Sequence, residues 1–339
     1  MRFIGRAPVR ISLCNGGDTD YYLGAMEWGN LINATIANLG YICKVTPKSS
    51  NDITYIYENK FNKKKIIKTI NSLEDSDESI CLILATLREI HPQFKGEIFI
   101  TTNVPEKSGL GGSSTLIVSL IKALQQSKKE VLIPEEIAKK AYHIERIVLG
   151  IKGGYQDQWA AAFGGGVNYL EFRKGNVFIE PLWLDEKLMQ HLEESILLFY
   201  LEPRIGNSSQ THEKLEASFK RKKKETTKIM IARRDNVLKT RDCLLKGKIG
   251  EFARLLNEEQ RKKELLNSNT ITTKSKELYE IAISAGSVAG KISGTGEGGC
   301  AFFICSKSRQ KTVIQALQQK GVIHLPLRLE RLDKMGYNI

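Results

Sequence analysis

The most informative segment of the chain reads Pro105-Glu106-Lys107-Ser108-Gly109-Leu110-Gly111-Gly112-Ser113-Ser114-Thr115. It lies between residues 97–104, whose pattern predicts a strand, and residues 115–124, whose apolar character predicts a helix. Glycines let a backbone approach a phosphate closely, and the free N–H groups of a helix that follows favour negative charge. The hydroxyls of Ser113 and Ser114 can bind phosphate oxygens or magnesium. The segment predicts an anion-binding loop, although a flexible turn with a serine cap would use the same residues.

Around this loop, short strand-like runs alternate with helical patterns, which predicts a mixed α/β or α+β layer architecture. We expect strands over 3–13, 31–45, 54–57, 97–104, 195–201 and 300–305, a hairpin over 167–182, and helices over 78–90, 115–124 and 134–150, with long Lys/Glu-rich helices up to about 267 and another helix after them. The composition shifts near Asp185. We therefore predict two domains, 1–185 and 186–339.

Composition and charge exclude several classes of protein. The 41% hydrophobic and 26% charged fractions are those of a soluble globular chain. No apolar run approaches the roughly 20 residues that cross a bilayer, and the first residues do not form a signal peptide, so we expect a cytoplasmic protein without a membrane partner. The six cysteines are scattered, which predicts reduced thiols and neither disulfides nor a zinc site. Much of the net charge of +13 falls in 214–263, a pattern typical of solvated helix faces, although a nucleic-acid surface would also be basic.

Two further segments combine glycine with polar groups. The first reads Ala7-Pro8-Val9-Arg10-Ile11-Ser12-Leu13-Cys14-Asn15-Gly16-Gly17-Asp18-Thr19-Asp20-Tyr21, a strand that runs into a turn. The second reads Lys291-Ile292-Ser293-Gly294-Thr295-Gly296-Glu297-Gly298-Gly299-Cys300 and contains a literal G-x-G-x-x-G. A dinucleotide fingerprint needs a helix after its glycines, but the residues that follow predict a strand. The segment is therefore not a Rossmann motif.

Taken in order, the three segments resemble the three motifs of the GHMP kinases, the family of galactokinase, homoserine kinase and mevalonate kinase. The central loop follows the family pattern P-x-G-x-G-L-G-S-S, with Lys107 at a position where glycine is common and Gly112 in place of the first serine. The first segment is similar to A-P-G-R-V-N-L-I-G-E-H-T-D-Y, and the last to K-x-x-G-a-G-x-G-G-c, which we expect to be a helix-to-strand loop against the phosphate loop. The resemblance implies an α+β two-domain fold, with a ribosomal-protein-like N-terminal α/β domain and a ferredoxin-like C-terminal domain.

The resemblance also implies a catalytic centre. Asp157 would face the acceptor hydroxyl as a general base or an orienting anion, with Arg10 beside it, and Mg²⁺ would be held by Ser113 and Glu145. Without the family, Asp157 would be an ordinary helix N-cap and Glu145 a surface ion-pair partner. ATP phosphates would be bound by Pro105, Lys107, Ser108, Gly109, Leu110, Gly111, Gly112, Ser113 and Ser114. Residues expected to contact the acceptor are Gly16, Gly17, Asp18, Thr19, Asp20, Gly154, Arg204, Gly294 and Gly296.

The acceptor is indicated by Gly153-Gly154-Tyr155-Gln156-Asp157-Gln158-Trp159, continuing to Gly165. This stretch resembles bacterial kinases of D-glycero-α-D-manno-heptose 7-phosphate, which phosphorylate the anomeric hydroxyl during synthesis of nucleotide-activated heptose for surface polysaccharide. A phosphorylated acceptor requires a second anion site away from the ATP loop, and Arg204, which follows a predicted strand, is the candidate. Fucose- or galactose-type kinases are the alternative acceptor classes. A non-catalytic nucleic-acid binder on the same scaffold is the alternative from another class, but we expect no nucleic-acid partner because the recognised binding motifs are missing. The oligomeric state cannot be read from the sequence.

Overall fold

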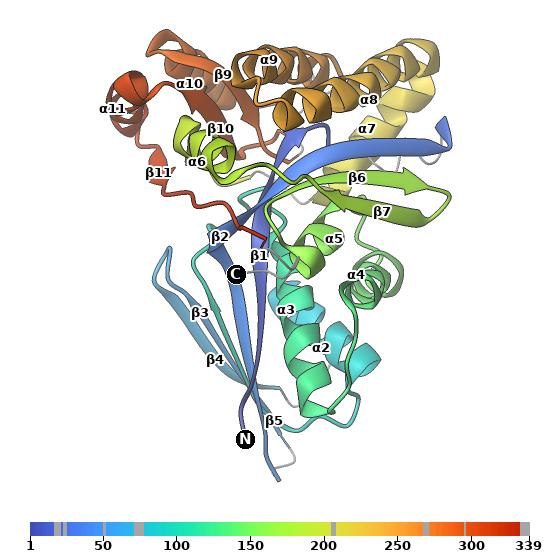
Figure 1. The fold of residues 1–339 in the computed structure, drawn as a ribbon. Coiled ribbons are helices and arrows are strands. Elements are labelled where there is room, and N and C mark those ends of the chain that lie inside the picture. The colour runs from blue at the N-terminus through green and yellow to red at the C-terminus, as the bar shows by residue number, and fades with distance from the viewer. Residues whose placement is uncertain are drawn as a thin grey trace.

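Two β-sheets, one from each half of the chain, form the framework of the protein (Figure 1). The computed structural model describes residues 1–16, 22, 26–49, 52–70, 78–204, 208–266, 271–294 and 296–332. Within these residues the first sheet has the order β4-β3-β5-β2-β6-β7, with β1 paired to β2, and the second has the order β11-β8-β10-β9. The first sheet contains β1 (Phe3–Cys14), β2 (Trp28–Pro47), β3 (Ile53–Asn59), β4 (Lys64–Ile70), β5 (Gly96–Thr102), β6 (Val167–Arg173) and β7 (Asn176–Pro181). The second contains β8 (Ile196–Glu202), β9 (Ser287–Ile292), β10 (Gly299–Cys305) and β11 (Ile323–Leu325).

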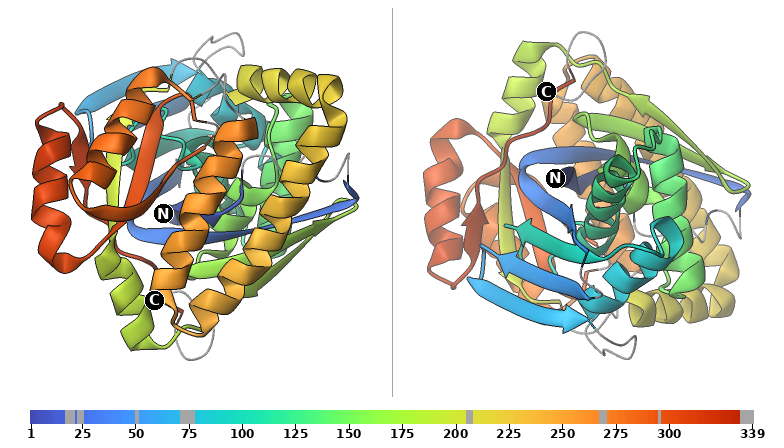
Figure 2. Two further views of the ribbon diagram at one scale, coloured as in Figure 1. Left: turned by 90° about the horizontal axis from the view of Figure 1, so that it is seen from above. Right: turned by 90° about the horizontal axis from the view of Figure 1, so that it is seen from below.

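Helices pack beside both sheets. The first half contributes α2 (Glu78–Ile90), α3 (Gly112–Ser127), α4 (Pro134–Tyr142), the π-helical turn η1 (His143–Val148) and α5 (Gln156–Phe163). The second half contributes α6 (Glu186–Ser195), α7 (Ser208–Arg221), α8 (Lys223–Leu245), α9 (Ile249–Leu266), α10 (Thr273–Ser284) and α11 (Lys307–Gln318). Figure 2 shows α8 and α9 side by side. Among the described helices, none has both the length and the apolar character needed to cross a membrane. The predicted α+β fold is confirmed.

Strand β1 joins the core to the functional site. Successive side chains of a strand point to opposite faces. Ile11 and Leu13 are therefore buried in an apolar cluster that also contains residues of β8, β10, α8 and α9. Arg10 and Ser12, on the other face, form hydrogen bonds with residues of α5. One strand thus stabilises the contact between the two halves and presents polar groups to the site.

The predicted strands and helices are present, but six elements of the described residues were not among them: β4, α5, α6, β9, β11 and α11. The glycine-rich segment after residue 292 is a further difference, because it connects strands β9 and β10 and is not a helix-to-strand loop. The preceding apolar and small residues, Ser287–Ile292, pair with β10 and so form a strand. The helix predicted over 134–150 ends as an α-helix at Tyr142 and continues as the π-helical turn η1.

The last described part of the chain returns to the first sheet (Figure 1). Leu329 forms a β-bridge with Ile36, and the backbone N–H of Glu330 donates to the carbonyl of Thr35 at 3.0 Å. The predicted domain boundary near residue 185 lies between β7 and α6, where the first sheet ends along the chain. The division into 1–185 and 186–339 stays a prediction, and residues 328–330 contact the opposite domain.

Candidate active site

The glycine-rich loop lies between β5 and α3, and its backbone is fixed from three directions. Leu110 is fully buried in the core shared by the two halves, and its carbonyl accepts from the Arg10 N–H at 3.2 Å. The carbonyl of Ser108 accepts from the Cys300 N–H of β10 at 2.7 Å. Gly111 has a φ of 85° and immediately precedes α3. The loop therefore leads rigidly into a helix N-terminus, the geometry that favours a bound phosphate.

The backbone conformation at Lys107 explains why glycine is common at this position in the family pattern. Its φ is 55°, in the left-handed region that glycine adopts without steric cost. Pro105 is buried, whereas the Lys107 side chain is exposed at the edge of the loop. Of the two departures from the pattern, Lys107 thus strains the backbone slightly, while Gly112 begins α3.

The third glycine-rich segment packs against this loop, as the sequence predicted. A Cβ atom on Gly299 would lie 2.5 Å from the carbonyl oxygen of Ser108, and one on Gly294 would lie 3.3 Å from the Cα of Gly109. Gly296 faces elsewhere, because its Cβ would meet the side chain of Ile271 at 2.8 Å. Gly294 therefore lies against the phosphate loop, whereas Gly296 packs against Ile271.

Arg10 and Asp157 meet beside the loop, although they are 147 residues apart in sequence. The guanidinium donates to Asp157 Oδ1 from Nε at 2.8 Å and from Nη2 at 2.5 Å. Its Nη1 donates to the carbonyl of Gly109 at 2.9 Å. The Cα of Gly111 faces the Asp157 carboxyl group, since a Cβ there would lie 3.3 Å from Oδ2. Arg10 thus holds the carboxylate against the phosphate loop.

The Asp157 carboxylate is held in its ionised form. Burial raises the pKa of Asp157. Three neighbours lower it by more: Arg10 through its charge and hydrogen bonds, Gln156 through a hydrogen bond, and Arg146 through its charge. The net shift of the pKa is therefore downward. The hydrogen bonds from Arg10 and Gln156 all end on Oδ1, and Oδ2 accepts none from the described residues. One carboxylate oxygen therefore remains available for an acceptor hydroxyl.

Glu145 lies on η1 with its side chain almost fully buried. Its Oε2 accepts from Ser114 Oγ at 2.5 Å and from Gln158 Nε2 at 2.6 Å, and Arg146 Nη1 lies 3.4 Å from Oε1. The sequence paired Glu145 with Ser113, but Ser114 is the serine in contact with it. The choice between the two serines follows from helix geometry. Because α3 begins at Gly112 and each helical residue is rotated by about 100° from the one before, Ser113 and Ser114 face different directions.

The sequence suggested that Arg204 lies away from the phosphate loop, but the structure places its side chain beside that loop. A Cβ on Gly109 would lie 3.0 Å from Arg204 Nη2, and a Cβ on Gly294 would lie 2.5 Å from it. The guanidinium is thus placed between the two glycine-rich segments.

Gly154, another residue predicted to contact the acceptor, accepts a hydrogen bond on its carbonyl from Arg146 Nη2 at 3.3 Å.

The predicted acceptor turn is only partly described. Gly16 has a φ of 99°, and its Cα lies beside the side chains of Ser12 and Gln156. The other predicted residues of this turn lie outside the described residues: Gly17, Asp18, Thr19 and Asp20.

Sequence reasoning missed the buried polar groups that fix the start of this turn. Asn15, fully buried, donates its backbone N–H to Glu259 at 3.0 Å and accepts from Lys291 Nζ on its carbonyl at 2.6 Å. Lys291 also donates to the carbonyl of Ser12 at 2.9 Å. Lys291 could have been predicted, because it is the first residue of the third motif. Glu259 could not, because it is one of many charged residues of the same helix.

Comparison with known proteins agrees with this geometry. Residues 78–165 match the model of the GHMP kinases N terminal domain, and residues 240–323 match that of the GHMP kinases C terminal domain. A protein of Campylobacter jejuni named D-glycero-alpha-D-manno-heptose 7-phosphate kinase is 30% identical over 323 residues, which cover 93% of each chain.

Solved structures give the same result. A D-glycero-D-manno-heptose 1-phosphate kinase from Bacteroides thetaiotaomicron superposes with a TM-score of 0.73 and 28% identity, over 97% of this chain and 96% of the other. A putative sugar kinase from Campylobacter jejuni has a TM-score of 0.74 and 28% identity, over 100% and 98% of the two chains. The names of these relatives place a phosphate on carbon 7 in one and on carbon 1 in another.

Proposed function

Because this chain belongs to the GHMP kinases and is a phosphotransferase acting on a sugar hydroxyl, we propose that its acceptor is D-glycero-α-D-manno-heptose 7-phosphate. ATP phosphorylates the anomeric hydroxyl, and the product is the 1,7-bisphosphate, an intermediate of nucleotide-activated heptose synthesis for surface polysaccharide. The observation that carries the proposal is the position of Asp157, held by Arg10 beside Gly111 of the phosphate loop. The acceptor itself is supported by the similarity to the Campylobacter jejuni kinase.

Few residues are needed for the reaction, since phosphoryl transfer depends mainly on alignment and on neutralising charge. The loop from Gly109 to Ser114 binds the phosphates of ATP. The free Oδ2 of Asp157 accepts or orients the proton of the anomeric hydroxyl. Arg10 keeps Asp157 ionised and, through Gly109, fixes its distance from the loop.

The residues around Glu145 fit a magnesium ion. A buried carboxylate with neighbouring serine hydroxyls is a set of hard oxygen donors, and kinase magnesium sites commonly use one or two carboxylates together with substrate phosphates. Glu145, with Ser113 or Ser114, would hold the ion. When bound, magnesium neutralises charge on the β- and γ-phosphates.

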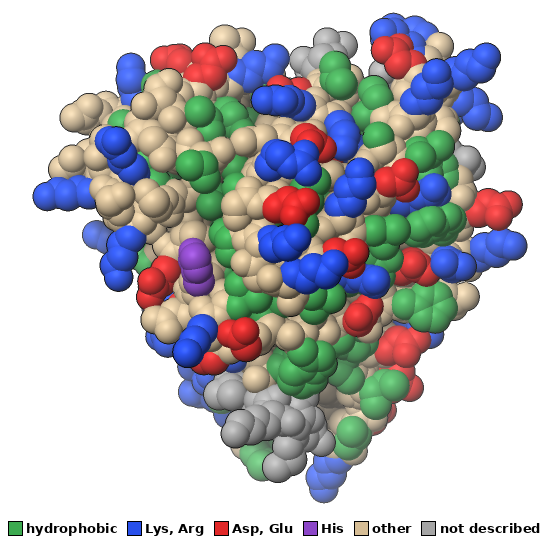
Figure 3. All heavy atoms as spheres, turned by 45° about the horizontal axis from the view of Figure 1, so that its top comes forward, with side chains coloured by type: hydrophobic (Ala, Val, Ile, Leu, Met, Phe, Trp, Pro, Cys, Tyr) green, Lys and Arg blue, Asp and Glu red, His purple; other side chains and the backbone are tan. Residues whose placement is uncertain are grey.

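The competing hypothesis of a nucleic-acid binder is less well supported. Figure 3 shows the face that carries α8 and α9, where Lys and Arg side chains are interspersed with Asp and Glu. Ion pairs such as Lys220–Glu216 and Arg254–Glu258 lie within single helices. A mixed face of this kind offers no continuous basic track for a phosphate backbone.

The experiment that tests the proposal is a coupled assay of ADP release with a panel of acceptors: heptose 7-phosphate, unphosphorylated heptose, fucose and galactose. We expect kcat/KM for heptose 7-phosphate to exceed that for all others, and ³¹P NMR of the product to show a phosphate on carbon 1. Equal use of heptose and heptose 7-phosphate would refute the acceptor assignment. Turnover of fucose or galactose alone would favour those kinase types, and salt-sensitive nucleic-acid binding without kinase activity would favour the other class.

A further inference from the structure

The guanidinium of Arg204 fills a space that exists because two loops carry glycine. Its Nη2 would lie 3.0 Å from a Cβ on Gly109 and 2.5 Å from one on Gly294. The backbone N–H of Arg204 lies 3.4 Å from the carbonyl oxygen of Lys107, at the start of the phosphate loop. Arg204 follows β8 by two residues, so the second sheet delivers this side chain to the loop of the first domain.

No hydrogen bond or ion pair of the Arg204 side chain is present among the described residues, and its Nε is buried without a partner. Burying a charged donor without an acceptor is costly. Burial and the positive charge of Arg10 lower the pKa of Arg204, and the opposing effects of Asp157 and Glu297 are smaller, so the net shift is downward. An anion at this point would supply the missing acceptor and relieve the repulsion between the two arginines.

The position of the anion follows from Arg10. Its Nη1 donates to the carbonyl of Gly109, the glycine that Arg204 also approaches, while its Nε and Nη2 hold Asp157. An anion between the two guanidinium groups therefore lies between the phosphate loop and the carboxylate that faces the acceptor. In a heptose the pyranose ring separates carbon 1 from carbon 7, so the acceptor's own phosphate cannot lie there while its anomeric hydroxyl reaches Asp157.

We infer that Arg204 is a catalytic residue that binds the γ-phosphoryl group of ATP during its transfer. The inference rests on the proposed kinase function. In the step, the bond from the γ-phosphorus to the bridging oxygen breaks and its electrons leave with ADP, while the anomeric oxygen forms a new bond to phosphorus and its proton passes to Asp157. Arg204 exchanges no proton; it donates hydrogen bonds to the oxygens of the moving group, as arginine side chains do in other phosphoryl transfers.

Nucleotide binding tests this inference without any acceptor. Calorimetry should compare ADP with a non-hydrolysable ATP analogue, both with Mg²⁺, in the wild type and in Arg204→Ala. We expect ADP affinity to change less than twofold and analogue affinity to fall roughly 10- to 100-fold, the value of a hydrogen bond to a charged group. Arg254→Ala, which removes an exposed arginine of α9, is the matched control and should leave both affinities unchanged. Equal weakening of ADP and the analogue would overturn the inference.

Kinetics provide the second test. We expect Arg204→Ala to lower kcat on the order of 10²–10³-fold with heptose 7-phosphate and equally with heptose, as loss of a transition-state donor does. Arg204→Lys, which keeps the charge but not the fork, should lose less and guards against misfolding of the alanine variant. A loss confined to heptose 7-phosphate would assign Arg204 to the acceptor's phosphate and overturn the inference. If neither heptose is a substrate, the proposed acceptor fails, while the nucleotide comparison still decides the role of Arg204.

Discussion

Arg233 of α8 and Glu259 of α9 form an ion pair in which neither side chain is exposed to solvent. Arg233 Nη2 donates to Glu259 Oε1 at 2.8 Å, and the same oxygen accepts from the backbone N–H of Asn15 at 3.0 Å. The pair thus connects two helices of the second half to the end of β1, directly before the turn that we assign to the acceptor. Buried charges of this kind are stable only while both partners remain.

Glu259→Gln should therefore destabilise the protein strongly. It leaves the Arg233 charge buried without its carboxylate, and breaking such a pair costs about 3–5 kcal/mol of unfolding free energy. Guanidinium chloride unfolding would measure the loss. Glu258→Gln, one residue away, is the control: its partner Arg254 is exposed, so the loss should stay below about 1 kcal/mol. Equally small losses in the two variants would show that the buried pair contributes little.

Asp157→Asn should abolish most catalysis while leaving the fold intact. The amide keeps the shape of the side chain but cannot accept a proton, and loss of a general base commonly lowers kcat by roughly 10²–10⁴-fold. Affinity for an ATP analogue should stay close to that of the wild type, whereas the melting temperature should fall somewhat because the buried Arg10 loses its charged partner. Turnover near the wild-type rate would remove Asp157 from the mechanism.

Arg10→Met should change the pH dependence of the same residue. In the wild type the charge and hydrogen bonds of Arg10, together with smaller effects of Gln156 and Arg146, outweigh burial and keep the pKa of Asp157 below its usual value, so the carboxylate stays ionised as pH falls. In the variant burial acts without that opposing charge, so the pKa of Asp157 rises and the acidic limb of kcat/KM moves to higher pH. An acidic limb at the same pH in both proteins would show that a different group titrates.

How far could these features be predicted from the sequence? The glycine-rich loop, Arg10 and Asp157 were predicted because motifs fix residue types at short spacing. The pairing of Glu145 with Ser114 was not, because choosing between adjacent serines requires knowing the residue at which α3 begins. The predicted position of Arg204 was wrong for a related reason. The sequence shows that this residue follows a strand, but not that β8 lies in a sheet whose end reaches the phosphate loop.

Buried polar contacts between the two halves were also beyond the sequence. Glu259 lies in a helix rich in Lys and Glu, and nothing local distinguishes it from its partly exposed neighbour Glu258. Only the packing of α9 against α8 and β1 removes water from one of the two carboxylates. Long-range burial of this kind depends on tertiary contacts that no local pattern records.

Magnesium dependence should separate the oxygen donors near the phosphate loop. Glu145→Gln and Ser113→Ala each should raise the magnesium concentration required for half-maximal activity, because each removes an oxygen donor from the proposed site. Ser114→Ala tests the serine that contacts Glu145 in the structure. Titrations of activity against Mg²⁺ at saturating ATP would measure the change. An unchanged requirement in Glu145→Gln would refute the assignment of this carboxylate, and an effect of Ser114→Ala alone would move the hydroxyl ligand by one residue.

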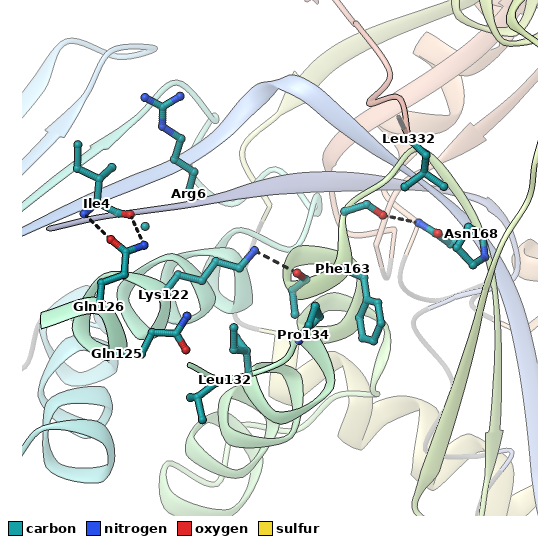
Figure 4. A pocket seen from close by; sticks show the side chains of 15 residues that line it. Ile4, Arg6, Lys122, Gln125, Gln126, Leu132, Pro134, Phe163, Asn168 and Leu332 are labelled. Atoms are coloured by element: carbon teal, nitrogen blue, oxygen red, sulfur yellow. Dashed lines mark hydrogen bonds between the residues drawn. The ribbon is translucent and has the colours of Figure 1, made fainter. Parts of the chain in front are cut away.

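Lys122 should make the stability of the protein depend on pH at the alkaline end. It lines a cavity of about 410 Å³ at the end of α5 opposite Asp157, and its Nζ donates to the carbonyls of Ala161 at 3.3 Å and Ala162 at 3.1 Å (Figure 4). Burial lowers the pKa of Lys122 to about 8, against a small opposing effect of Glu330. The ammonium form is therefore disfavoured in the folded state relative to the unfolded chain.

Between the folded pKa of about 8 and the ordinary lysine value of 10.5, the unfolded chain binds more protons than the folded protein, so this residue makes stability rise with pH. Below pH 8 both states are protonated and the contribution of Lys122 is constant. We expect the free energy of unfolding of the wild type, relative to Lys122→Met, to rise by about 2 kcal/mol from pH 8 to pH 10.5, after allowance for the partial exposure of the side chain. Denaturant titrations at several pH values would measure it, with the exposed Lys140→Met of α4 as control. A difference between wild type and Lys122→Met that does not change with pH, or one that Lys140→Met reproduces, would show that Lys122 keeps its charge in the folded protein.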